Sequence, residues 1–197
     1  MKICAVIVAG GGSSRMGREK AFELIRGQSI IDRIVACLGA QMTDVVINAN
    51  GDLQRFGHIG VPVIGDMRKD IHSPVAGLHA ALAFGRDSGH GAVLTVPSDA
   101  PFLPSDLMER LLVAARPAAI AASAGQRHFL TGLWSTSLLD ELEKAMDSQL
   151  VPRLQDWVSI CEAATVEWAV EPYDPFLNVN TRQELAEAQR IAAEFDL

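Results

Sequence analysis

A glycine-rich segment near the N-terminus carries the residue types that a phosphate-binding loop needs. Gly10, Gly11 and Gly12 follow a short apolar stretch, and Arg15 and Lys20 come shortly after them. Glycines allow the backbone to approach a phosphate closely, and backbone N–H groups can donate to its oxygens. Arg15 and Lys20 add the positive charges that a triphosphate requires. We therefore predict that this segment holds the phosphates of a nucleotide, with Arg15 and Lys20 as catalytic cations.

The spacing of this segment differs from that of two other phosphate-binding loops. A P-loop needs Lys-Ser or Lys-Thr directly after its second glycine, whereas Arg18 follows Gly17 here. The dinucleotide fingerprint, counted from Gly10 and Gly12, needs a third glycine where Arg15 stands. A nicotinamide-dependent oxidoreductase is therefore the least favoured alternative.

Two carboxylates follow later apolar segments of the chain. Asp66 comes after the third such segment, and Asp99 comes after the fourth, between Pro97 and Pro101. The two prolines give Asp99 a rigid setting. Mg²⁺ binds in proteins through one or two carboxylates together with substrate phosphates. We predict that Asp99 is the metal ligand and a catalytic residue.

Short apolar segments alternate with amphipathic ones along the chain. Hydrophobic periodicity and residue composition predict strands over residues 3–8, 45–47, 61–64, 92–96, 118–122, 129–134 and 162–169. A β-hairpin or longer turn at 125–127 is expected to join the strands at 118–122 and 129–134. Predicted helices span residues 30–39, 74–84 and 137–146, and others open at Pro104-Ser105 and at the capping box of Thr181 and Glu184. Ser29 and Ser73 are the predicted N-caps of the first two helices.

Apolar strands that alternate with helices favour a mostly parallel sheet covered on both faces. We predict one α/β domain over residues 1–197, built as a three-layer α/β/α sandwich. In such a sheet, ligands bind at the carboxyl ends of the strands. The glycine-rich segment, Asp66 and Asp99 all follow predicted strands, so we expect them to converge at this edge.

Composition and charge limit the other classes of function. The 197 residues carry a net charge of −7, without the cluster of Lys and Arg that nucleic-acid binding needs. Apolar stretches are far shorter than the ~20 residues of a membrane span, and no signal peptide is recognisable. The three cysteines, Cys4, Cys37 and Cys161, are odd in number and widely spaced, which favours a reducing compartment. We predict a cytoplasmic protein that binds neither nucleic acid nor membrane.

Six short motifs follow one another in a familiar order. They are Val8–Lys20 with its glycines, Asn48–Asn50, Asp66, Pro74–Gly77, Ser98–Phe102 and Asn178–Thr181. This series resembles the signature of the molybdenum cofactor guanylyltransferases, and the resemblance extends from residue 3 to about residue 190. The glycine-rich loop by itself indicates only the wider nucleotidyltransferase superfamily, whereas the two asparagine motifs indicate the guanylyl branch.

The resemblance implies a Rossmann-like nucleotidyltransferase fold and a Mg²⁺-dependent reaction. GMP would pass from GTP to the molybdenum–molybdopterin cofactor, releasing pyrophosphate and forming molybdopterin guanine dinucleotide. The implied GTP-binding residues are Val8, Ala9, Gly10, Gly11, Lys20, Asn48, Asp66 and Asp99. The implied second-substrate residues are His128, Asn178 and Asn180, and the two asparagines would lie beside the pterin substrate or the metal. The GTP and metal site would thus lie within about residues 1–105, and the second substrate would bind to the C-terminal part. A molybdoenzyme maturation protein would be a further partner.

The sequence departs from the family pattern at a few positions. Ser73 replaces a glycine, and Phe129 and Arg182 each replace a proline. Residues 149–156 keep only Arg153 of the paired arginines often seen there. A second substrate that bears phosphate should be bound by cations.

Two alternatives to the guanylyltransferase remain open at this point. A sister enzyme of the same fold would use CTP, or would transfer a nucleotide to a sugar phosphate. The glycine-rich loop and Asp99 do not separate these enzymes, but the nucleoside-facing residues Asn48 and Asp66 would. A non-catalytic nucleotide-binding domain is the other alternative, and the presence of Lys20, Asp66 and Asp99 together argues against it.

Overall fold

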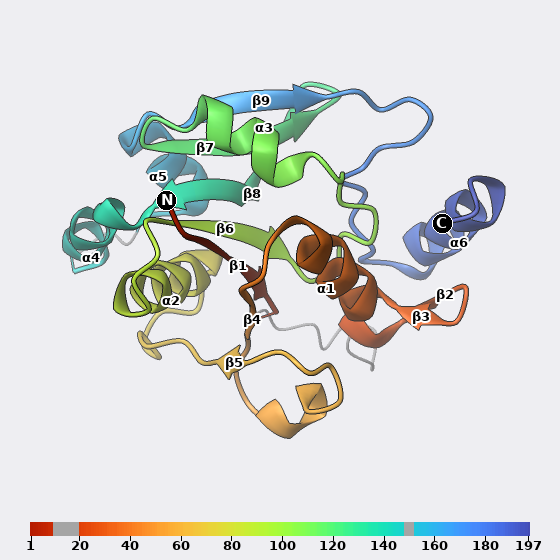
Figure 1. The fold of residues 1–197 in the computed structure, drawn as a ribbon, viewed down its shortest axis with the longest axis horizontal. Helices are drawn as coiled ribbons and strands as arrows, with labels where there is room; N and C mark the ends of the chain where they lie inside the picture. The colour runs from red at the N-terminus through yellow and green to blue at the C-terminus, as the bar shows by residue number, and fades with distance from the viewer. Residues whose placement is uncertain (10–19, 148–151) are drawn as a thin grey trace.

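The computed structural model describes residues 1–9, 20–147 and 152–197, which form an α/β fold around a seven-stranded sheet (Figure 1). The strand order is β5 (Val63–Ile64), β4 (Val45–Asn48), β1 (Ile3–Val8), β6 (Ala92–Pro97), β8 (Gln126–Ser135), β7 (Ala118–Ser123) and β9 (Ala164–Trp168). Neighbouring strands of this sheet are parallel, except that β8 runs antiparallel to both β6 and β7. The prediction of a mostly parallel sheet is confirmed.

Helices cover both faces of the sheet (Figure 1). One face carries α1 (Ile30–Gln41), α3 (Leu107–Ala114) and α6 (Arg182–Glu194), and the other carries α2 (Pro74–Asp87), α4 (Leu139–Met146) and α5 (Leu154–Ile160). The side chains of β1 alternate between these faces, since Ala5 and Ile7 pack in the core with α1 while Val6 and Val8 pack in a core with α2. Burial on both sides explains why this strand is apolar throughout. The predicted three-layer architecture is confirmed.

Two predicted boundaries were wrong at segments that contain a proline. The predicted strand at 61–64 is shorter, since β5 begins only after Pro62, and a proline cannot donate to the sheet ladder. The helix expected to open at Pro104-Ser105 begins at Leu107 with Asp106 at its N-cap position, and the N–H of Leu107 donates to the carbonyl of Pro104. The prolines thus belong to the turns before these elements.

The turn between β7 and β8 also differs from its prediction. It consists of Ala124 and Gly125, with φ angles of 49° and 74°. Two positive φ angles are what a tight two-residue hairpin turn requires. Gln126 and Arg127 are therefore the first residues of β8 and not part of the turn.

Several short elements were not predicted. They are the hairpin of β2 (Leu24–Ile25) and β3 (Gln28–Ser29), the 3-10 helices η2 (Lys20–Phe22), η3 (Leu53–Phe56) and η4 (Thr136–Leu138), and the helix α5. The predicted helix at 137–146 thus begins as the 3-10 turn η4 and continues as α4. Within the described ranges, no helix combines the length and apolar character needed to cross a membrane.

All three predicted N-cap residues occupy the N-cap position, and two of them cap the helix with their side chains. Ser29 accepts a hydrogen bond from the backbone N–H of Asp32, and Thr181 accepts one from that of Glu184, both at 3.2 Å. Ser73 occupies the N-cap position of α2, but its side chain makes no capping bond, and its Oγ is buried without a partner among the described residues. The predicted N-cap position of Ser73 is therefore confirmed, although its hydroxyl does not cap the helix.

Candidate active site

Four of the predicted nucleotide-binding residues lie at one edge of the sheet. Val8 at the end of β1 is in register with Asn48 of β4 on one side and Pro97 of β6 on the other. Asp99 follows β6 by two residues, and Asp66 follows β5 by two residues. Because β1, β4, β5 and β6 are parallel, these residues share the carboxyl edge where ligands bind in such sheets.

The segment that joins β1 to η2 is described only at its ends. Ala9 extends β1 by donating its backbone N–H to the carbonyl of Asn48 at 2.7 Å. Lys20 opens η2 and is partly buried. Gly10, Gly11 and Arg15 lie outside the described residues, so their predicted roles remain predictions.

Lys20 contacts a residue from the far end of the chain. Its Nζ donates to Oδ1 of Asn180 at 2.7 Å, across 160 positions of sequence. The backbone N–H of Asn180 donates to Oε2 of Glu184 at 2.8 Å, and the hydroxyl of Thr181 donates to the same oxygen at 2.9 Å. Partial burial acts to raise the pKa of Glu184, but these hydrogen bonds and the charge of Lys20 outweigh it and lower the pKa. A predicted phosphate-binding cation and a predicted second-substrate residue thus meet at one place.

Asp99 is a carboxylate with an unused acceptor. Its backbone carbonyl accepts from the N–H of Val179 at 2.8 Å, which joins it to the asparagine motif. Its Oδ1 is buried, and no hydrogen-bond partner for it exists in the part of the chain that is described. Burial raises the pKa of the Asp99 carboxyl, while the nearby positive charge of Lys20 opposes this shift. A buried carboxylate oxygen without a donor suits a cation as its partner.

These residues fit the Mg²⁺ that the resemblance implies. Outside the undescribed segments, no group of three or more His, Cys, Asp or Glu side chains could hold a metal ion. Mg²⁺ does not need such a group, because it retains waters and binds substrate phosphates alongside one or two carboxylates. Asp99 would supply the carboxylate, and the fit rests on its Oδ1, which is buried without a partner among the described residues.

The raised pKa of Asp99 leads to a prediction for stability. Unfolded chains ionise Asp near its ordinary pKa of about 3.9, whereas the folded chain keeps the proton to higher pH. Raising the pH between these two pKa values therefore destabilises the fold, and the loss is complete above the folded pKa. We expect Asp99→Asn to raise the melting temperature at pH 7 but not at pH 3, as measured by circular dichroism. An equal shift at both pH values would contradict the ionisation argument.

Asp66 is held by two asparagine side chains. Oδ1 of Asp66 accepts from Nδ2 of Asn48 at 2.9 Å, and Oδ2 accepts from Nδ2 of Asn50 at 2.6 Å. Asn48 is fully buried, and its Oδ1 is without a partner among the residues that the structure covers. The predicted pair of Asn48 and Asp66 is therefore brought together, and Asn50 is an additional member that the sequence did not single out as a site residue.

The first turn of α2 packs closely against Val8 and Asn48 at the ends of β1 and β4. A Cβ placed on Gly77 would lie 2.6 Å from Cγ1 of Val8 and 3.1 Å from Oδ1 of Asn48. Only a glycine allows the helix to approach the ends of β1 and β4 this closely. The glycine of the Pro74–Gly77 motif thus has a packing role at the site.

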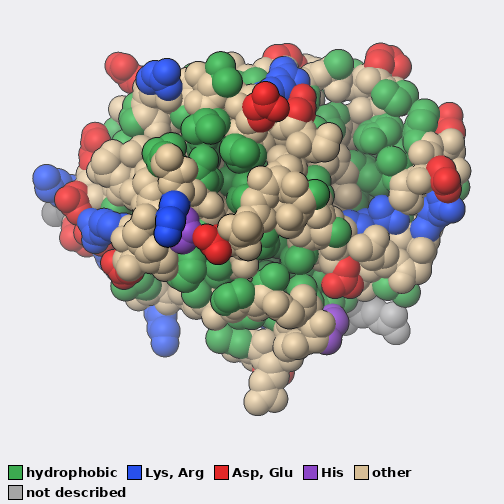
Figure 2. Space-filling model, viewed as in Figure 1, with side chains coloured by type: hydrophobic (Ala, Val, Ile, Leu, Met, Phe, Trp, Pro, Cys, Tyr) green, Lys and Arg blue, Asp and Glu red, His purple; other side chains and the backbone are tan. Residues whose placement is uncertain are grey.

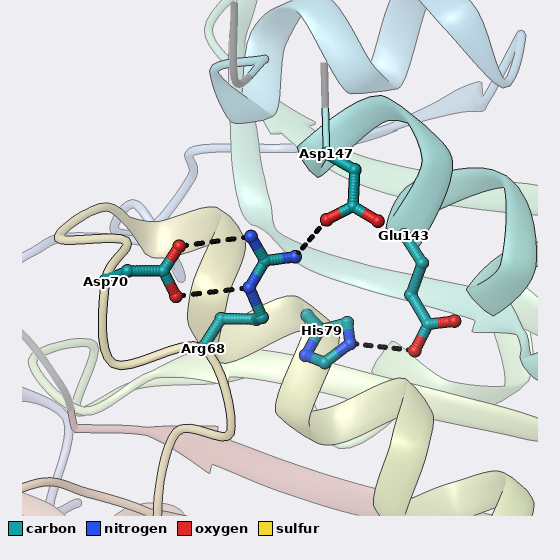
Figure 3. A network of polar contacts seen from close by, with 5 residues as sticks. All are labelled: Arg68, Asp70, His79, Glu143 and Asp147. Carbon is teal, nitrogen blue, oxygen red and sulfur yellow. Dashed lines mark hydrogen bonds and ion pairs between the residues drawn. The ribbon is translucent and has the colours of Figure 1, made fainter. Parts of the chain in front are cut away.

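The loop that carries Asp66 is anchored by a network of charged side chains (Figure 3). Arg68 binds both oxygens of Asp70 at 3.1 Å and donates to Asp147, at the C-cap of α4, at 2.7 Å. Below it, His79 of α2 contacts Glu143 of α4 at 3.1 Å. The Arg68 contacts tie the loop between Asp66 and α2 to the end of α4, and the His79 contact joins α2 to α4. Sequence spacing gave no signal for these partners from α4.

His128 lies at the same edge because β8 is antiparallel to its neighbours. The start of β8 therefore meets the end of β7, where Nε2 of His128 is 2.8 Å from Oγ of Ser123. The ring of His128 packs on Phe176 with centroids 4.7 Å apart. Burial lowers the pKa of His128, and the negative charge of Asp174 opposes this shift. Ser123 is a buried polar contact of His128 that the sequence analysis missed.

The remaining predicted second-substrate residues are exposed. Asn178 and Asn180 flank the buried Val179 in the segment before α6. Arg153, the arginine retained from the family's pair, binds Asp156 through Nε at 3.0 Å. The described contacts therefore place Asn180 beside Lys20 and leave Arg153 engaged in a local ion pair.

Charges of both signs are scattered among hydrophobic side chains over the face seen in Figure 2. No concentration of one sign of charge is seen on this face, although the chain as a whole carries a net charge of −7. Phosphates would be bound by local groups at the site, such as Lys20, and not by a broad positive surface.

The Rossmann-like sheet, and the lysine and carboxylate at its ligand edge, define the class: this is an α/β protein of the nucleotidyltransferase type. A family model described as the MobA-like NTP transferase domain matches residues 5–166. The chain belongs to this family.

Relatives with established names agree with this assignment. The molybdenum cofactor guanylyltransferase of Nitrobacter hamburgensis is 38% identical over 195 residues, which cover 95% of this chain and 93% of that protein. The protein of the same name from Rhizobium meliloti is also 38% identical, over 94% of this chain and 89% of its own length. The resemblance seen in the motifs is confirmed.

Solved structures share the fold at lower identity. Molybdopterin-guanine dinucleotide biosynthesis protein A from Archaeoglobus fulgidus superposes with a TM-score of 0.72 at 24% identity, covering 98% of this chain and 100% of that one. CMP:2-keto-3-deoxy-manno-octonic acid synthetase complexed with CTP superposes with a TM-score of 0.75 at 16% identity, covering 99% and 100%. Because one fold serves such different enzymes, the fold alone does not select the nucleotide.

Proposed function

We propose that this protein transfers GMP from GTP to the molybdenum–molybdopterin cofactor, releasing pyrophosphate and forming molybdopterin guanine dinucleotide. One observation carries the proposal: the Asn48–Asp66 pair and Asp99 lie at one edge of the sheet, in a chain of the MobA-like family. Relatives of nearly full length that bear the guanylyltransferase name support it.

The proposed reaction does not require a general base from the protein. The attacking group is the terminal phosphate of the cofactor, which is largely ionised at neutral pH because its second pKa is near ~6. Its oxygen forms a bond to the α-phosphorus of GTP while the bond to the bridging oxygen breaks, and pyrophosphate leaves with that electron pair. Positioning and charge stabilisation then supply most of the rate.

Different residues of the chain would bind the phosphates, the nucleoside, the metal and the pterin substrate. Lys20, with Arg15 and the glycine-rich backbone, would hold the β- and γ-phosphates, while Asn48 and Asp66 would bind the nucleoside. Asp99 would hold Mg²⁺, which when bound neutralises negative charge on the phosphates. His128, Asn178 and Asn180 would contact the pterin substrate.

Other parts of the proposal rest on composition. The three cysteines are free, as expected for the cytoplasm, where thiols stay reduced. The acidic charge favours a small anionic ligand bound at a local site over nucleic acid or an anionic membrane surface. A molybdoenzyme maturation protein is the proposed receiver of the product.

A thermal-shift panel with GTP, CTP, ATP and UTP, each with and without Mg²⁺, tests the nucleotide. A ligand at about 100 times its Kd stabilises a protein by roughly 2.7 kcal/mol, which is readily seen as a rise in Tm. We expect the largest rise with GTP and Mg²⁺. A rise with CTP instead would assign the chain to the sister branch, and no rise with any nucleotide would favour a non-catalytic role.

A further inference from the structure

The side chain of Asn50 makes two hydrogen bonds to Asp66. The backbone N–H of Asp66 donates to Oδ1 of Asn50 at 3.1 Å, and Nδ2 of Asn50 donates to Oδ2 of Asp66 at 2.6 Å. The chemistry of the partners fixes the orientation of the amide, because a backbone N–H only donates and a carboxylate only accepts. The two bonds form a ring that sets the direction of the Asp66 side chain relative to its own backbone.

Two other residues add hydrogen bonds that hold Asp66 and Asn50 in place. Nδ2 of Asn48 donates to Oδ1 of Asp66 at 2.9 Å, so each carboxylate oxygen receives one amide donor. The guanidinium of Arg55 donates to the backbone carbonyl of Asn50 at 2.9 Å, which holds Asn50 itself in place. Asp66 therefore has a defined carboxylate plane even though Asn50 is exposed.

A carboxylate held in this way retains acceptors for a ligand. Its two oxygens offer about four acceptor positions, and the two amide donors occupy only one on each oxygen. The remaining acceptors, one per oxygen, suit two neighbouring donors. GTP offers two such pairs, namely N1–H with the 2-amino group of guanine and the 2′- and 3′-hydroxyls of ribose.

We propose that Asn50 is a positioning residue that orients Asp66 toward a donor pair of the nucleoside and thereby sets nucleotide selectivity. The inference rests on the proposed function, in which Asp66 binds the nucleoside part of GTP. Without Asn50, the side chain of Asp66 can rotate, and the alignment of both acceptors is lost. The fold loses little, because water can reach the groups that the exposed Asn50 leaves behind.

The test compares Asn50→Ala with a matched control, Gln54→Ala. Gln54 is exposed in the adjacent η3, and its hydrogen bonds to other described residues are made through its backbone. Calorimetry would give the Kd of each protein for GTP, inosine triphosphate, which lacks the 2-amino group, and the 2′- and 3′-deoxy forms of GTP. Tm would be measured alongside.

We expect the wild type and Gln54→Ala to prefer GTP over at least one of these analogues. In Asn50→Ala this preference should shrink about tenfold, with Tm nearly unchanged, because a purely structural role would not alter a ratio of affinities. If Asn50→Ala no longer discriminates against inosine triphosphate, the carboxylate of Asp66 binds the guanine base. If it no longer discriminates against a deoxy form of GTP, the carboxylate binds the ribose hydroxyls. Wild-type ratios in Asn50→Ala would overturn the inference, whereas a wild type that binds no GTP would overturn the proposed function itself.

Discussion

Asp99→Asn is expected to lower kcat by about 100-fold or more while weakening GTP binding much less. The substitution keeps the size of the side chain but removes the charge that would hold Mg²⁺ against the reacting phosphates. Asp99 would hold Mg²⁺ where negative charge develops on the leaving pyrophosphate, so the loss should appear in turnover. Steady-state kinetics with molybdopterin as acceptor, at saturating Mg²⁺, would measure kcat and KM separately.

The control for this experiment is Asp87→Asn, the same chemical change at an exposed position near the end of α2. It should leave both kinetic constants near their wild-type values. Near-normal turnover of Asp99→Asn at saturating Mg²⁺ would contradict the assignment of Asp99 as the metal ligand.

Gly77→Ala is expected to destabilise the fold by about 1–3 kcal/mol, as overpacking of a close contact does. The new methyl group would lie 2.6 Å from Cγ1 of Val8, and Val8 has few rotamers into which it can move. Relief requires α2 to shift away from Asn48, so GTP binding should weaken as well. Urea unfolding would measure the stability, and the rise in Tm with GTP and Mg²⁺ would measure binding.

Gly39→Ala provides the matched control in α1. Gly39 is exposed, and a Cβ there would meet nothing within 4 Å. Alanine in a helix interior is roughly 0.5–1 kcal/mol more favourable than glycine, so this variant should gain stability. If the two variants shift stability in the same direction, the close contact at Gly77 does not limit the packing of α2.

The sequence predicted the strands that build the ligand edge and the order of the layers. β1 is apolar along its whole length and β6 is apolar except for Thr95, because helices cover both faces, and this pattern is readable without a structure. The capping box before α6 was also readable, since a cap is a local interaction between Thr181 and Glu184. Asp66 and Asp99 could be chosen as candidates because each follows a strand.

Contacts between distant segments could not be predicted in the same way. The bond from Lys20 to Asn180 spans 160 positions, and Asn50 reaches Asp66 only because the β4 and β5 segments run side by side. The predicted turn at 125–127 already indicated that β8 runs antiparallel to β7. Nothing in the sequence indicated that β8 lies between β7 and β6, the arrangement that brings His128 to the ligand edge. α5 did carry a signal, since Leu154 and Trp157 have helical spacing and are buried.

The first turn of α6 joins helix initiation to the geometry of the site. Glu184 accepts from Asn180 and Thr181 with a single carboxylate oxygen, and the side chain of Asn180 in turn receives Lys20. The same carboxylate therefore stabilises the start of the helix and holds the backbone of Asn180, whose side chain receives Lys20. A change that frays the first turn of α6 should also displace the Asn180 amide from Lys20, so local helix stability and the geometry around Lys20 are coupled.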